Sequence, residues 1–78
     1  MNKIRLSEAD RFKCYYIDEI KVKEEFIKTR LEKFGLLKNQ KIELLFYNYG
    51  KNSFLIKVMG VKYAIDKCIC DEIYVKDE

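Results

Sequence analysis

Apolar and polar residues alternate through the second half of the chain, and this alternation constrains the fold more than any other feature of the sequence. It predicts strands over residues 41–47 and 53–59, because every second residue of a strand turns to the same face. Two further strands are predicted over 61–65 and 72–76. The apolar residues expected to face inward in these strands are Ile42, Leu44, Phe46, Phe54, Ile56, Val58, Val61, Tyr63, Ile65, Ile73 and Val75.

Short turns separate the predicted strands. Residues 48–52 contain Asn and Gly, which can take positive φ, and they predict a hairpin loop. Gly60 predicts a second tight turn, and residues 66–71 predict a single helical turn with Asp66 as its N-cap. A further strand is predicted over 13–18, where aromatic and β-favouring residues are concentrated.

One helix is predicted over residues 23–34. Ile27, Leu31 and Phe34 are spaced by about one and two helical turns and form one apolar stripe. Gly35 follows directly and predicts the left-handed residue that ends the helix.

These elements predict a mainly β protein of about five strands with one or two short helices. A small, strongly bent barrel suits them, because closure covers edges that a short sheet would otherwise expose. A chain of 78 residues has room for one domain, which we assign to residues 1–78.

Several function classes are excluded by what the sequence lacks. The chain has no His, so we expect no His-based catalytic triad and no mixed Cys/His zinc site. Its three Gly residues lie too far apart for a phosphate-binding loop, and we expect no catalytic residue and no enzyme activity. The longest uncharged run, residues 44–50, is far too short to span a bilayer, and the N-terminus is not followed by an apolar signal core. We therefore expect a cytoplasmic protein without direct membrane insertion.

Three cysteines, Cys14, Cys68 and Cys70, are an odd number, which favours reduced thiols over a disulfide framework. Cys68 and Cys70 form the only cluster with the character of metal ligands. Even with Cys14 they fall short of the four ligands of a zinc site, so we expect no metal or cofactor and keep a transition-metal site as an alternative. Three acidic residues that could hold a hard cation loosely, but that a solvated surface explains at least as well, are Asp66, Asp71 and Glu72.

The segment Arg-Leu-Glu-Lys-Phe-Gly-Leu at residues 30–36 resembles the end of the helix in the FeoA family, the small proteins of bacterial ferrous iron transport. The resemblance continues in the strand at 42–44, in residues 64–70, and in Ile-Tyr-Val at 73–75. It covers nearly the whole chain from about Leu6. The family's Pro-Gly after the helix is Lys-Asn here, so this turn must depend on an Asn in the left-handed region.

The resemblance implies an SH3-like barrel that acts in the cytosol as an accessory protein of ferrous iron transport. Its implied partner is the GTP-binding part of a FeoB-type membrane ferrous permease, whose transport it would modulate without carrying iron itself. In the register of this resemblance Cys70 takes the place of a small buried Ala, which favours a buried Cys70 and an exposed Cys68.

A partner would dock on the second face of the 44–59 hairpin, which is more apolar than solvent requires. The alternative is that these side chains belong to the core. Leu36 or Leu37 either anchors the end of the helix or contacts a partner. The docking candidates are Leu36, Leu45, Tyr47, Tyr49, Leu55 and Met59.

Other functions remain as alternatives. An RNA- or ribosome-binding module would stack bases on Tyr47 and Tyr49 and place lysines on phosphates, as Lys51, Lys57 and Lys62 would allow. The net charge of +3 is small for such a protein and argues against nucleic acid. A metal-sensing protein would use the three cysteines, and a homodimer is a further alternative.

Overall fold

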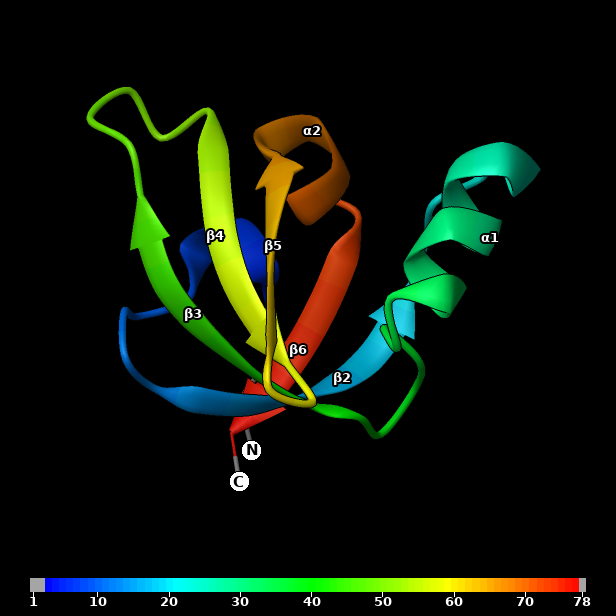
Figure 1. Cartoon of the computed structure of the whole chain (residues 1–78), viewed down its shortest axis with the longest axis horizontal. Coiled ribbons are helices and arrows are strands. Elements are labelled where there is room, and N and C mark those ends of the chain that lie inside the picture. The colour runs from blue at the N-terminus through cyan, green and yellow to red at the C-terminus, as the bar shows by residue number, and fades with distance from the viewer. Residues whose placement is uncertain (1–2, 78) are drawn as a thin grey trace.

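The computed structural model describes residues 3–77, so residues 1, 2 and 78 of the predicted domain lie outside it. Within this range the chain forms one antiparallel sheet with the strand order β1-β6-β2-β3-β4-β5. The elements are β1 (Lys3–Arg5), the 3₁₀ turn η1 (Leu6–Glu8), β2 (Cys14–Ile20), α1 (Glu25–Lys33), β3 (Lys41–Tyr47), β4 (Ser53–Val58), β5 (Val61–Asp66), α2 (Lys67–Cys70) and β6 (Ile73–Asp77). The sheet curls strongly, α2 covers one end of it, and α1 stands to one side (Figure 1). The mainly β fold is confirmed.

The inner side of the curled sheet holds a single apolar core. Most of the residues that the alternation predicted to face inward are buried there, and the exceptions are Phe46, Val61 and the half-buried Tyr63. No charged side chain among the described residues is buried. The core residues are Leu6, Ala9, Tyr15, Ile17, Leu31, Leu36, Ile42, Leu44, Phe54, Ile56, Val58, Ile65, Cys70, Ile73 and Val75.

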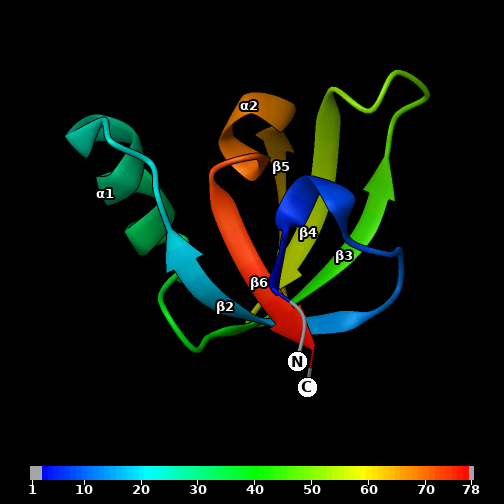
Figure 2. The same ribbon diagram turned by 180° about the vertical axis from the view of Figure 1, so that it is seen from behind.

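The prediction of about five strands missed β1 and η1. Lys3–Arg5 pairs antiparallel with β6, at the opposite end of the sequence, and places Leu6 fully inside the core. Seen from behind, β1 and η1 lie against β6 (Figure 2). A strand of three residues carries too little alternation to be recognised, and its pairing depends on contacts that local sequence does not contain.

The prediction that Phe46 faces inward is wrong, because β3 contains a bulge. The register between β3 and β4 shifts at Leu45, so Phe46 stands opposite Leu55, and Tyr47 stands opposite Phe54. Phe46 is consequently 52% exposed. Tyr47 takes the inward place that the alternation gave to Phe46, with its ring centroid 5.8 Å from that of Phe54.

Two turns connect the strands of the hairpins. Between β4 and β5, Met59 and Gly60 both have positive φ, 51° and 83°, as a two-residue type I′ turn requires. In the β3–β4 loop, the side-chain oxygen of Asn48 accepts hydrogen bonds from the backbone N–H groups of Asn52 and Ser53. Positive φ in that loop falls on Lys51 and not on its Asn or Gly residues, which corrects the prediction.

The helix α1 ends as the sequence predicted. Gly35 has φ +92° and donates its N–H to the carbonyl of Glu32 at 3.0 Å, while the N–H of Leu36 donates to the carbonyl of Leu31 at 2.9 Å. These two bonds and the burial of both leucines form a Schellman motif. Asn39 has φ +73°, so the turn after the helix does depend on an Asn in the left-handed region.

The C-terminal elements also agree with the predicted order. Asp66 occupies the N-cap position of α2, although its side chain makes no capping hydrogen bond. Val61 was expected to face inward but is 49% exposed, because it lies at the end of β5 beside the β4–β5 turn.

Candidate functional site

A group of aromatic side chains, of which Phe12 and Phe46 are exposed and Tyr47 is half-buried, lies where the β3–β4 hairpin meets the loop before β2. The guanidinium carbon of Arg11 lies 5.6 Å from the ring centroid of Phe12, 5.9 Å from that of Phe46 and 5.6 Å from that of Tyr47. Phe12 is 70% exposed, and Leu55 lies opposite Phe46 on the outer face of the sheet. We call this group, Arg11, Phe12, Phe46, Tyr47 and Leu55, the aromatic patch.

Two local irregularities of the backbone produce the aromatic patch. The bulge at Leu45 turns Phe46 to the outside of the sheet. Phe12 has φ +62°, a region that non-glycine residues rarely adopt, and its N–H donates to the carbonyl of Leu44 at 2.6 Å. That hydrogen bond ties the loop to β3, and the guanidinium carbon of Arg11, in the same loop, lies 5.6 Å and 5.9 Å from the ring centroids of Phe12 and Phe46.

The structure brings together only some of the six residues predicted to dock a partner. Leu55 and Tyr47 belong to the aromatic patch, and Tyr49 is fully exposed in the adjacent loop. Leu45 is half-buried at the bulge. The alternation predicted that Tyr47 shares the outer face with Leu55, and this is wrong. The bulge exchanges the places of Tyr47 and Phe46, so Tyr47 faces inward.

Two of the six candidates do not contribute to this surface. Leu36 is fully buried and anchors the end of α1, so it is not available to a partner. Met59 is 73% exposed, but it lies at the other end of β4, where its sulfur is 3.1 Å from the position that a Cβ on Gly35 would take.

Sequence reasoning missed Arg11, Phe12 and Phe46 as surface residues. A signal for Phe46 existed, because four apolar residues in succession at positions 44–47 interrupt the alternation and are compatible with a bulge. Arg11 and Phe12 lie in a loop and carry no periodic signal that would place them beside β3.

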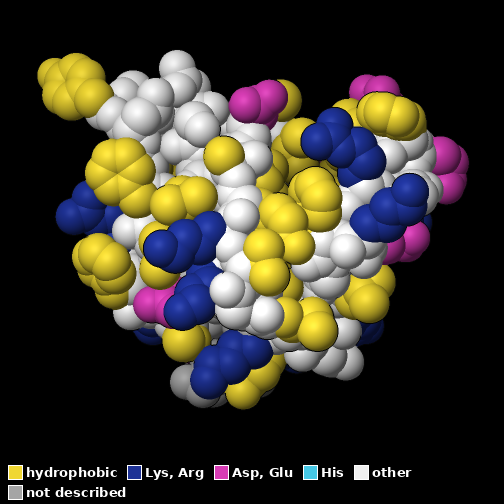
Figure 3. All heavy atoms as spheres, viewed as in Figure 1, with side chains coloured by type: hydrophobic (Ala, Val, Ile, Leu, Met, Phe, Trp, Pro, Cys, Tyr) yellow, Lys and Arg dark blue, Asp and Glu magenta, His cyan; other side chains and the backbone are white. Residues whose placement is uncertain are grey.

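Basic side chains border the aromatic rings. The ammonium group of Lys51 lies 4.7 Å from the ring centroid of Tyr47. Arg11 lies over three rings, and a cation over an aromatic face is attracted by the ring quadrupole. Hydrophobic side chains interspersed with Lys and Arg cover the face of the molecule over β3 and β4 (Figure 3).

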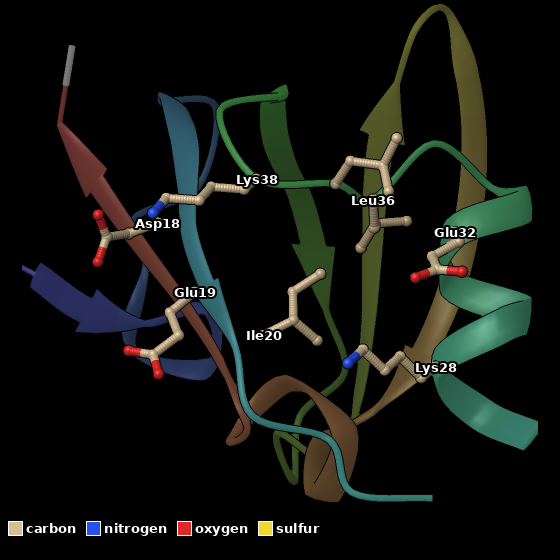
Figure 4. Close-up of a pocket in the computed structure, with 8 residues that line it drawn as sticks. Asp18, Glu19, Ile20, Lys28, Glu32, Leu36 and Lys38 are labelled. Atoms are coloured by element: carbon tan, nitrogen blue, oxygen red, sulfur yellow. The ribbon is translucent and has the colours of Figure 1, made fainter. Parts of the chain in front are cut away.

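A groove of about 370 Å³ lies between β2 and the residues around the end of α1. Ile20 and Leu36 lie within it, and Lys28 and Glu32 approach from α1 (Figure 4). The nearby carboxylates of Asp18 and Glu19 point away from these residues.

Both of those carboxylates form ion pairs with lysine side chains. Lys3 Nζ lies 2.8 Å from Glu19 and 3.3 Å from Asp18, and Lys76 lies 3.6 Å from Asp18. The hydrogen bond from Lys3 lowers the pKa of Glu19. Partial desolvation opposes ionisation of Asp18, but Lys3 and Lys76 outweigh it and lower the pKa of this carboxyl too. These carboxylates are therefore paired with lysines on the surface of the sheet and do not form a cation site.

A second groove, of about 380 Å³, runs between α1 on one side and β5 with α2 on the other. Hydrophobic side chains are visible in the middle of the face between these elements (Figure 3). Phe34 of α1 stacks on Tyr63 of β5 with ring centroids 4.2 Å apart. The residues that line this groove are Glu24, Phe26, Ile27, Arg30, Leu31, Phe34, Ala64, Ile65, Asp66 and Ile69.

The cysteines do not form a common site. Cys70 is fully buried, as the resemblance implied, and burial raises the pKa of its thiol to about 12. Cys68 is exposed and Cys14 is half-buried at the start of β2. Within residues 3–77 no three side chains of His, Cys, Asp or Glu gather in a way that could hold a metal ion.

The acidic residues around α2 have other partners. Asp71 accepts a hydrogen bond from the hydroxyl of Ser7 and pairs with Lys67 at 2.9 Å. The Ser7 hydroxyl and then the Lys67 ammonium lower the pKa of Asp71.

None of the helices in the described part of the chain is long and apolar enough to cross a membrane.

Comparison with known proteins places this geometry in a family. The family model of the FeoA domain matches residues 4–77. Several solved structures share the fold, and three of them illustrate it. A crystal structure of an iron uptake regulatory protein (FeoA) matches with a TM-score of 0.84 and 22% identity, over 97% of each chain. The solution structure of FeoA from Chlorobium tepidum matches with a TM-score of 0.87 and 18% identity, over 95% of this chain and 70% of that one.

A longer protein contains the same fold. ScaR with bound Zn²⁺ matches with a TM-score of 0.82 and 24% identity, over 96% of this chain, which spans only 37% of that protein. A search of curated proteins found no significant match. The match over residues 4–77, together with the order of elements and the compact antiparallel sheet, shows that this chain belongs to the FeoA domain family.

Proposed function

We propose that this protein is a cytosolic accessory protein of ferrous iron transport that docks on the GTP-binding part of a FeoB-type membrane ferrous permease and modulates its transport. Membership of the FeoA family, which is associated with ferrous iron transport, supports a role in this process. The protein acts by binding a partner and not by catalysis, and it carries no iron of its own.

The aromatic patch supports docking as the mode of action. Exposed Phe12 and Phe46 flank Arg11, and aromatic residues and Arg are enriched at the centres of protein interfaces. A partner that covers the patch removes these rings from water and strengthens the attraction between Arg11 and the rings, because the local dielectric falls. The exposure of Phe12 and Phe46 beside Arg11 is the observation that carries the proposal.

Calorimetric titration into the isolated cytosolic GTP-binding region of a ferrous permease from the same cell tests the proposal, with and without a GTP analogue. We expect binding that Phe46→Ser weakens by about tenfold or more, since the loss of a buried Phe contact costs more than about 1.4 kcal/mol. Phe46 is exposed, so this variant keeps its melting temperature within a few degrees.

The matched control is Val61→Ser, which removes an exposed apolar side chain of similar accessibility outside the aromatic patch. It should bind like the wild type. Two outcomes would refute docking of this region through the aromatic patch. One is no binding both with and without the GTP analogue, and the other is equal binding by the wild type and both variants.

A further inference from the structure

The strand β5 is an edge of the sheet, because the strand order ends with it. An edge strand has backbone N–H and C=O groups that no neighbouring strand uses. A groove of about 380 Å³ separates β5 from α1, and its lining includes Ala64 and Asp66, so space remains between this edge and the helix. The β5 edge is therefore accessible to another chain.

The turn between β4 and β5 determines which backbone groups are unused. Val58 and Val61 flank a two-residue type I′ turn and form a hydrogen-bonded pair, and such pairs recur at every second residue. The bond from the N–H of Lys67 to the carbonyl of Asn52, 3.0 Å long, continues the same alternation at the other end. The N–H and C=O groups of the residues between these pairs point away from β4.

Five backbone groups remain for a ligand. They are both groups of Lys62, both groups of Ala64, and the N–H of Asp66, whose carbonyl accepts the first hydrogen bond of α2. An extended segment that pairs antiparallel with β5 can satisfy all five.

The groove between β5 and α1 would receive the side chains of such a segment. It borders the free edge at Ala64 and Asp66, and its wall includes Ile27, Phe34 and Ile69. Alternate side chains of an added strand point to opposite faces, so every second one would contact this apolar wall. An edge strand beside a helix, with an apolar groove between them, matches the geometry of strand-addition sites.

The charges along the edge distinguish the two ends of a ligand. Lys62 and Asp66 lie on the outer face of β5, separated by Ala64, and neither forms an ion pair with another described residue. Glu24 and Arg30 both line the groove that Asp66 borders, so the groove itself carries both signs of charge and the difference between the two ends comes from Lys62 and Asp66. An antiparallel ligand therefore complements the edge with a basic residue opposite Asp66 and an acidic residue opposite Lys62.

We propose that the β5 edge and the adjoining α1 groove bind an extended segment of a partner protein by strand addition. The segment has the order basic, apolar, any residue, apolar, acidic, with its two apolar side chains opposite Ile65 and Tyr63. The site is separate from the aromatic patch and does not depend on which protein that patch binds.

Fluorescence polarisation with a labelled peptide of sequence Gly-Lys-Ile-Thr-Val-Glu-Gly tests this proposal on the whole chain. We expect saturable binding, and weaker binding by the peptide in which Lys and Glu exchange places. Amide exchange measured by NMR with the peptide present should slow at Lys62, Ala64 and Asp66, because their N–H groups become hydrogen-bonded.

Three variants separate the contributions. Ala64→Pro removes an N–H that points away from β4, so the sheet keeps its hydrogen bonds while peptide binding falls about tenfold. The double variant Lys62→Glu with Asp66→Lys should reverse the preference between the two peptides. Lys57→Gln is the control, because Lys57 lies opposite Lys62 on the same face but not at the edge, and Gln adds no carboxylate that would pair with Lys62.

Binding that depends on Ala64 and reverses with the charges supports the proposal. Binding unaffected by both changes, or no binding at millimolar peptide, overturns it. Self-association of the chain that Ala64→Pro abolishes, observed by sedimentation without peptide, would assign the edge to a second copy and would also overturn it.

Discussion

The ring of Phe34 stacks on the ring of Tyr63, with centroids 4.2 Å apart and planes 15° from parallel. Phe34 is the C-cap residue of α1 and continues its apolar stripe, and Tyr63 lies in the middle of β5. The stack therefore joins α1 to the edge strand of the sheet. It also fixes one side of the groove in which we place the strand-addition site.

The stack should contribute a measurable coupling energy. We expect Phe34→Leu and Tyr63→Leu to destabilise the protein less in combination than the sum of the single effects, by about 0.5–1.5 kcal/mol. Urea unfolding of the four members of this double-mutant cycle measures the coupling. Additive effects would show that the two rings contribute only their separate burial.

Substitution of the glycines should follow their backbone conformations. Gly35→Ala puts a Cβ at φ +92°, 3.1 Å from Met59 Sδ, and should cost about 1–2 kcal/mol of unfolding free energy. Gly60→Ala, at φ +83° with no crowding, should cost less. Gly50 lacks a positive φ and has room for a Cβ, so Gly50→Ala should stay within about 0.5 kcal/mol. Thermal or urea unfolding gives the order, and equal losses at all three positions would contradict it.

The cysteines should differ in reactivity. Cys68 is exposed, whereas Cys70 is fully buried with its thiol pKa raised to about 12, chiefly by burial. Because the thiolate is the reactive form, iodoacetamide near neutral pH should alkylate Cys68 in the native protein and Cys70 only after unfolding. Mass spectrometry of digested protein identifies the modified residue. Alkylation of Cys70 as rapid as that of Cys68 in the native state would contradict the burial of this thiol.

Acid should weaken the attachment of η1 to α2. The Ser7 hydroxyl and the Lys67 ammonium lower the pKa of Asp71. Since the folded pKa lies below the unfolded value of about 4, the carboxylate stabilises the fold above that value, and this contribution is lost as pH falls through the folded pKa. We expect a constant melting temperature between about pH 7 and pH 5 and a decline below about pH 4.

The variant Asp71→Asn isolates this contribution. It should melt lower than the wild type at neutral pH, and the difference should shrink in acid, where Asp71 of the wild type is protonated. A difference that stays the same at every pH would mean that the charge of Asp71 is not what stabilises the contact with Ser7 and Lys67.

Local sequence signals predicted most of the fold. Gly35 and the leucine after it predicted the end of α1, and the alternation over 53–59 predicted the buried face of β4, because both depend on residues close together in the chain. The strand β1 was missed because three residues cannot display a period and their partner is the C-terminal strand. Local signals therefore predicted the elements that depend on neighbours in the sequence and missed the strand that depends on a distant partner.

The aromatic patch was only partly predictable for the same reason. Leu55 and Tyr47 were identified from the pattern of the hairpin, although Tyr47 was expected on the outer face. A single extra residue at Leu45 exchanged the faces of Phe46 and Tyr47, since each register shift of one residue inverts a strand's faces. The contribution of Arg11 depends on a loop that only the folded chain brings beside β3.

Uptake of ferrous iron tests the proposed function most directly. Cells that contain the permease and lack this protein would be supplied with the wild type, with Phe46→Ser, or with Val61→Ser, each at equal abundance. We predict that the wild type and Val61→Ser change the uptake rate equally and that Phe46→Ser leaves it as in cells without the protein. Uptake that the wild type does not change, or that Phe46→Ser changes as the wild type does, would contradict the proposal that this protein modulates ferrous transport through its aromatic patch.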